Sequence, residues 1–213
     1  MQRKARLSRR ELLALGGVTA VAGIGSLALR RLQPVGTLLP DSPVVRAALA
    51  ETAPIGGNSA GNLTMLVFTD YNCPVCRPTH RQMMAAVDRN GGVRVKFLDW
   101  PIFGDDSRAA ARVAIAADAQ GLYLPVHAAL MQGGGRANAR TAERALADAG
   151  GNVDRLRQTL TTDAARIEGQ LSRNAVHAFG LGLGGTPGHL IGHLRLLGRT
   201  SESEFRRAFK RAL

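Results

Sequence analysis

Residues 62–76 read NLTMLVFTDYNCPVC, in which a strand-like run leads into a pair of cysteines. Residues 62–69 form a largely apolar run bounded by turn residues, which is typical of a buried strand. Residues 70–72 then read as a turn, and residues 73–76 open a helix that we expect to reach about residue 90. A proline at the start of a helix removes no hydrogen bond, because the first N–H groups have no partner there. The sequence therefore predicts a CxxC motif at a strand-to-helix junction.

The residues downstream of this junction predict a mixed α/β domain with a helical insertion. Residues 93–98 alternate in polarity like a second strand, which completes a strand–helix–strand unit. Residues 105–183 carry helical periodicity and glycine breaks, and they predict four or five short helices. After a sharp break at 184–188, two short strands surround Gly192-His193, and a helix capped by Ser201 closes the chain.

The spacing of the two cysteines assigns them different roles. A thiol reacts as its thiolate, and unpaired N–H groups at a helix N-terminus lower the thiol pKa below its free value of about 8.5. We expect Cys73 at the cap position, with an exposed sulfur that attacks or is attacked. Cys76, one turn further on, should lie deeper and resolve the mixed disulfide. Val75 offers no side-chain hydrogen bond, so stabilisation of the thiolate must come from the helix terminus and from neighbours.

Metal binding is the main alternative chemistry for the cysteine pair. A closed zinc site needs four ligands, whereas Cys73, Cys76 and His80 supply three at most. A two-coordinate Cu(I) site that uses both thiolates stays open, because soft thiolates select this ion. His80 itself is either a packing residue on the helix or a group that acts near the cysteines. The chain has no other cysteine, so a multi-disulfide scaffold is excluded.

The N-terminal segment 1–31 has the layout of an export signal or a membrane anchor. Basic residues precede an uncharged, glycine-rich run from Leu12 to Leu29, and SRRELL at 8–13 resembles the twin-arginine export motif. Small residues at Ser26 and Ala28 offer a cleavage site, and an uncleaved segment would be the protein's contact with the membrane. Both alternatives place the domain outside the cytoplasm, in the periplasm or another extracytoplasmic compartment. The segment 32–60 reads as a lead-in linker with one possible short helix.

Composition argues against nucleic-acid binding, and the absence of known cofactor motifs argues against a cofactor-dependent enzyme. The net charge of +12 comes partly from the N-terminal segment, and the remaining basic residues are scattered rather than clustered. Aromatic residues make up 4% of the chain, which leaves few stacking platforms, so we expect no nucleic-acid partner. No flavin, haem or nucleotide motif is visible, and we expect no dissociable cofactor.

Taken together, the motifs resemble the DsbA-like branch of thioredoxin-fold proteins. The similarity extends from about residue 55 to the C-terminus, and the thioredoxin-like domain is expected over 61–213, with its helical insertion at about 105–183. The matching motifs are FTDYNCPVC at 68–76, WPIFG at 100–104, GLY at 121–123, HAALM at 127–131 and GGTP at 184–187.

The resemblance implies further site residues and a mode of substrate binding. It implies that Thr186-Pro187 is a cis peptide facing the active cysteines, since X–Pro bonds adopt cis at modest cost. In this family the adjoining backbone edge pairs with an extended substrate peptide. Val67 stands where the family often has an acid. Asp99, at the end of the second strand, is either a buried acid near the cysteines or a strand-end cap.

These features predict an exported thiol-disulfide oxidoreductase, with disulfide oxidation as the favoured activity. Substrate proteins with free thiols would attack the Cys73–Cys76 disulfide, and a membrane redox partner would reoxidise the pair. A threonine before the cis-proline occurs in relatives that are isomerases or reductases, so a periplasmic isomerase or reductase is the first alternative. A Cu(I)-binding protein is the second.

Overall fold

The structure, a computed structural model, describes residues 34–213, and the predicted export segment 1–31 lies outside them. Residues 36–213 form one compact unit. Within the described residues, no helix has both the length and the apolar character needed to cross a membrane.

The described residues build a six-stranded mixed sheet at the centre of this unit, in the order β1-β6-β5-β3-β4-β2. The strands β3 and β4 run parallel, and every other neighbouring pair is antiparallel. The parallel pair matches the two strands predicted from the sequence, and α3 connects them. The bounds are β1 (Thr37–Leu38), β2 (Ile55–Gly57), β3 (Leu63–Thr69), α3 (Cys76–Asn90), β4 (Val93–Asp99), β5 (Gly188–Ile191) and β6 (Leu194–Leu197).

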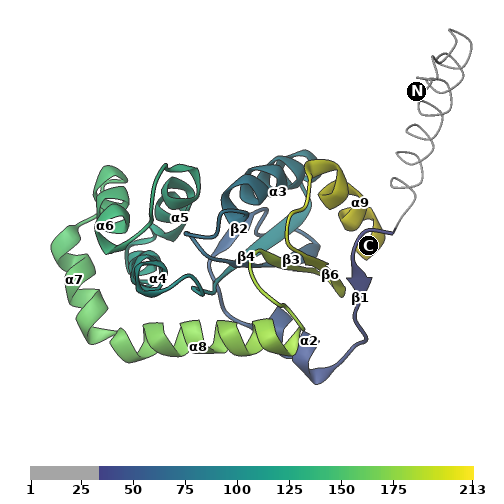
Figure 1. The fold of residues 1–213 in the computed structure, drawn as a ribbon, viewed down its shortest axis with the longest axis horizontal. Helices are drawn as coiled ribbons and strands as arrows, with labels where there is room; N and C mark the ends of the chain where they lie inside the picture. The colour runs from purple at the N-terminus through teal and green to yellow at the C-terminus, as the bar shows by residue number, and fades with distance from the viewer. Residues whose placement is uncertain (1–33) are drawn as a thin grey trace, which may run out of the picture. The chain divides into compact units, whose positions relative to one another are not determined.

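Helices cover both faces of the sheet (Figure 1). The helix α3 packs beside the C-terminal helix α9 (Glu202–Ala212), whose N-terminus carries the expected Ser201 cap in a capping box with Glu204. On the other face, α2 (Pro43–Ala50) and α8 (Ala164–Gly180) bury apolar side chains against Leu66 and Phe68 of β3. Because strand residues alternate between faces, β3 contributes to both layers and is buried along nearly its whole length.

The helical insertion lies between β4 and β5, as the sequence indicates, and Figure 1 shows most of it beside the sheet. The long helix α8 leads the chain back across the sheet to β5. Asparagine side chains cap two of these helices, α6 through Asn138 and α7 through Asn152. The elements are α4 (Asp105–Ala117), the 3-10 helix η1 (Asp118–Gln120), α5 (Tyr123–Gln132), α6 (Ala139–Asp148), α7 (Val153–Thr162) and α8.

The segment 32–60 contains more structure than a linker with one short helix. Its described part supplies α2, capped by Ser42 as expected, and also β1 and β2 at opposite edges of the sheet. The strand β2 is built from Ile55, Gly56 and Gly57, and Gly57 has a φ of 66°. A Cβ at Gly57 would lie 2.6 Å from the Val93 carbonyl oxygen, so this edge needs glycine for close approach as well as for conformation.

Candidate active site

The CxxC motif follows the end of β3, and the N-cap of its helix lies two residues later than the sequence predicts. The residues Cys73 to Cys76 form a tight turn in which the Cys76 N–H donates to the Cys73 carbonyl oxygen at 3.2 Å. Val75 is the N-cap and Cys76 the first residue of α3. Cys73 therefore precedes the cap, although the N–H groups of the first turn still reach its sulfur.

Both cysteines are free thiols, and both are buried. The expectation of an exposed Cys73 sulfur is wrong, since this residue is 2% exposed. The loop that carries Thr186 covers it, and the Cys73 thiol donates a hydrogen bond to the Thr186 carbonyl oxygen at 3.2 Å. The sequence could not reveal this contact, because it joins residues 113 positions apart.

The two thiols have opposite tendencies to ionise. The hydrogen bond with the Cys76 side chain is the largest cause that lowers the pKa of Cys73 from 9.0 to about 6, and the backbone N–H groups of Val75 and Cys76 add to it. Burial, and then the hydrogen bond with Cys73, raise the pKa of the Cys76 thiol. At pH 7 Cys73 is therefore about 90% thiolate while Cys76 keeps its proton.

The Thr186-Pro187 peptide bond is cis, the geometry that the family resemblance implies. The sheet positions this peptide, because Gly188 at the start of β5 pairs with Phe68 of β3, shortly before the cysteine turn. The Pro187 carbonyl oxygen accepts from the Gly198 N–H at 2.8 Å, which fixes the far side of the loop.

Asp70 anchors the cysteine turn, a role that sequence reasoning missed. This carboxylate is 1% exposed and accepts four hydrogen bonds. One oxygen accepts from the N–H groups of Ile102 at 2.6 Å and Phe103 at 2.9 Å. The other accepts from the Asn72 N–H at 2.7 Å and the Ser107 hydroxyl at 2.8 Å. The WPIFG motif at 100–104 was a signal for this contact, since two of its amides hold Asp70.

Asn72 ties the same turn to the helical insertion. Its side-chain oxygen accepts from the Ala137 N–H at 2.7 Å, and its amide donates to the Ala137 carbonyl oxygen at 2.9 Å and to Ser107 at 3.0 Å. The loop 133–138 is thereby fixed beside Cys73. A surface hollow of about 330 Å³ lies between them, lined by Cys73, Arg77 and Arg136 among others.

Asp99 and His80 lie in a buried polar cluster with Tyr71, Tyr123 and His127. The Tyr123 hydroxyl donates to Asp99 at 2.9 Å, and the Tyr71 hydroxyl lies 2.9 Å from His127 Nδ1. Burial raises the pKa of Asp99 to about 7 and lowers the pKa of His80 to about 4. The His80 ring contacts the His127 ring, with centroids 5.1 Å apart. Tyr71 connects this cluster to the cysteine turn, and the HAALM motif at 127–131 contains its central histidine.

Comparison with known proteins identifies the family. The family model described as thioredoxin matches residues 49–211. The chain belongs to the thioredoxin family. Among solved structures, a thioredoxin-like oxidoreductase from Silicibacter pomeroyi DSS-3 is 31% identical with a TM-score of 0.74, and the match covers 81% of this chain and 98% of that one. A comparison with curated proteins gives no match.

Other thioredoxin-family structures share the fold at lower identity. The thiol-disulfide exchange protein alpha-DsbA2 from Wolbachia pipientis is 24% identical with a TM-score of 0.72, and the match covers 78% of this chain and 90% of that one. A periplasmic thioredoxin-like protein from Salmonella enterica serovar Typhimurium is 24% identical with a TM-score of 0.69, covering 82% and 98%. The predicted thioredoxin fold with inserted helices is confirmed, and structures described as DsbA-type share it. The family match supports the predicted thiol-disulfide oxidoreductase activity.

Proposed function

We propose that this protein is a disulfide oxidase that transfers its Cys73–Cys76 disulfide to substrate proteins. The observation that carries the proposal is the unequal acidity of the two thiols, with the Cys73 pKa lowered to about 6 and the Cys76 pKa raised. Whatever stabilises the Cys73 thiolate stabilises the reduced protein, and so makes the disulfide a stronger oxidant. A low-pKa thiol is also the better leaving group when the substrate departs.

The reaction then takes two exchanges. A substrate thiolate attacks the Cys73 sulfur, the Cys73–Cys76 bond breaks, and Cys76 leaves and takes up a proton. A second substrate thiol, as its thiolate, attacks the substrate sulfur of the mixed disulfide, and Cys73 leaves as a thiolate. The substrate has lost two electrons and gained a disulfide, while the enzyme has become the dithiol. A membrane redox partner would accept these electrons and restore the disulfide.

Thr186 and Pro187 are the proposed substrate-binding residues. The Thr186 carbonyl oxygen lies 3.2 Å from the Cys73 sulfur, so a peptide that paired with this backbone edge would lie beside the reacting sulfur. Asp99 and His80 have a supporting role in this proposal. Their hydrogen bonds and ring contacts lead to Tyr71 in the cysteine turn rather than to either sulfur.

A periplasmic location fits this chemistry, because disulfides persist in oxidising compartments. The Salmonella structure is described as periplasmic, which supports the same placement here. The twin-arginine route and the choice between cleavage and anchoring rest on residues 1–31, which lie outside the described part of the chain.

The test is the reduction potential of the Cys73/Cys76 couple, measured by equilibration with glutathione buffers. A potential towards the roughly −120 mV of DsbA supports the oxidase, and Cys73→Ser should abolish oxidation of a dithiol peptide. A potential near the roughly −270 mV of thioredoxin would overturn the proposal in favour of an isomerase or reductase. Stoichiometric Cu(I) uptake by the reduced protein against a competing chelator, without peptide oxidation, would favour the metal-binding alternative.

A further inference from the structure

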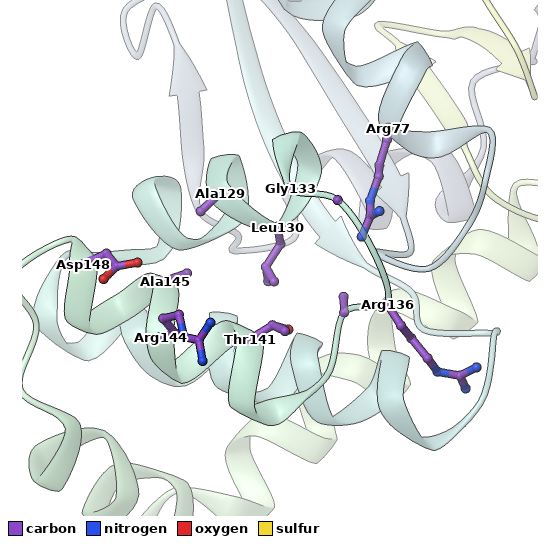
Figure 2. A pocket seen from close by; sticks show the side chains of 11 residues that line it. Arg77, Ala129, Leu130, Gly133, Arg136, Thr141, Arg144, Ala145 and Asp148 are labelled. Atoms are coloured by element: carbon purple, nitrogen blue, oxygen red, sulfur yellow. The ribbon is translucent and has the colours of Figure 1, made fainter.

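A second hollow adjoins the one beside Cys73 and is lined by arginines. It has a volume of about 210 Å³ and lies between α5, α6 and the loop that joins them. Figure 2 shows Arg77 reaching it from α3 and Arg144 lying on α6. We call it the arginine hollow. Arg77 and Arg136 line both hollows, so the arginine hollow lies directly beside the one that contains Cys73.

The arginine hollow has more positive charge than its neighbours neutralise. Neither Arg77 nor Arg144 forms an ion pair within residues 34–213, and the buried Nε of Arg77 has no hydrogen-bond partner there. Arg136 pairs with Asp106 at 2.5 Å, and Asp148 is the sole acidic residue in the lining. The half-buried Arg77 guanidinium therefore favours an anion as its partner, and a carboxylate matches its forked N–H donors.

Apart from Thr141 and Asp148, the other residues that line the hollow are small or apolar. Ala129 and Leu130 of α5 face Ala145 of α6 across it. A ligand for this hollow therefore combines a short aliphatic stem with a terminal negative charge. A glutamate side chain has both features, whereas a free inorganic anion would leave the apolar walls uncovered.

We propose that the arginine hollow binds a glutamate that lies close in sequence to the cysteine being oxidised, so that the protein prefers acidic substrate segments. This inference rests on the proposed oxidase function, since the substrate must first engage Cys73. Arg77 and Arg144 supply the positive charge. Because the hollow lies on one side of Cys73, the preference should apply only to a glutamate on one side of the substrate cysteine.

The experiment measures oxidation of synthetic dithiol peptides by the oxidised full-length protein. Glutamate is placed two, three or four residues from the attacking cysteine, on either side, and each peptide has a glutamine twin of the same length. At low ionic strength we expect the best glutamate peptide to react about two- to thirtyfold faster than its twin, the range for two exposed ion pairs. The preference should be lost in 1 M salt, where the screening length is about 3 Å.

Variants separate this site from general charge effects. Arg144→Glu should remove the preference for glutamate and make the protein react faster with a lysine version of the peptide than with the glutamine twin. Arg77→Gln should weaken the same preference. Arg140→Glu is the matched control, because Arg140 lies on α6 but outside the hollow, and the glutamate preference should survive it.

The outcomes distinguish the two proposals. Equal rates for glutamate and glutamine peptides with the wild-type protein overturn the arginine hollow and leave the oxidase intact. An equal loss of preference in the Arg144→Glu and Arg140→Glu proteins also overturns it, since long-range charge would then suffice. If the wild-type protein oxidises none of the peptides, the oxidase proposal fails and the inference fails with it.

Discussion

Replacing Cys76 by alanine should raise the pKa of Cys73, because the Cys76 side chain is the largest cause of its low value. The pKa of Cys73 is about 6 in the intact pair. A hydrogen bond to a charged group contributes about 1.5–3 kcal/mol, and one pKa unit corresponds to about 1.4 kcal/mol. Loss of this bond should therefore move the pKa to about 7–8. The thiolate fraction at pH 7 would fall from about 90% to between roughly 10% and 50%.

The assay is the rate of alkylation of the reduced protein by iodoacetamide, followed across pH. The Cys76→Ala protein has a single thiol, so its profile reports Cys73 alone. In the wild type, the raised pKa of Cys76 keeps that thiol protonated over the same range. Cys76→Ser is the control, since its hydroxyl can still donate to the thiolate and should hold the midpoint closer to 6. A Cys76→Ala profile with the wild-type midpoint would refute the assignment and leave the backbone N–H groups as the cause.

Two further predictions concern stability, and urea denaturation checks both. Asp70→Ala leaves four hydrogen-bond donors without their acceptor and should lower the free energy of unfolding by about 3 kcal/mol. The control is Asp88→Ala on the exposed face of α3, which should change the free energy of unfolding by less than about 0.5 kcal/mol. Equal losses in the two variants would contradict the anchoring role of Asp70. Burial lowers the pKa of His189 to about 3, so below its ordinary value of 6.5 the unfolded chain takes up the proton first. Stability should therefore fall as the pH falls from about 6.5 towards 3, and less steeply in His189→Leu; parallel slopes would count against this histidine.

The sequence predicts those parts of the fold that local patterns determine. The two parallel strands, the closing hairpin, the Ser42 and Ser201 caps and the helical insertion follow from apolar periodicity and capping residues within a short window. The edge strands β1 and β2 do not, because two or three residues such as Ile55-Gly56-Gly57 carry no period. The strand β2 forms because β4 offers an edge to pair with, and β1 forms because β6 offers the other edge.

In the candidate site, too, the sequence reveals the local features but not the contacts between distant residues. The cysteines could be found because their spacing is itself the signal, and their different roles follow from that spacing. Their surroundings could not, because the partners of Asp70 and Asn72 lie more than 30 residues away, in the WPIFG motif, α4 and the loop at Ala137. The burial of Cys73 has the same origin, in a loop that approaches only when β5 pairs with β3.

The contact between Cys73 and Thr186 links the redox state of the pair to substrate binding. In the dithiol below the Cys73 pKa of about 6, the Cys73 proton satisfies the Thr186 carbonyl oxygen at 3.2 Å. In the disulfide, Cys73 carries no proton, so this carbonyl loses its donor, and a buried carbonyl without a partner costs free energy. A backbone N–H of an extended substrate is a suitable replacement. At pH 5, where Cys73 is protonated, we therefore expect the oxidised protein to hold a reduced substrate peptide more tightly than the dithiol form does. At pH 7 the Cys73 thiolate has no proton to donate either, so this difference in affinity should shrink.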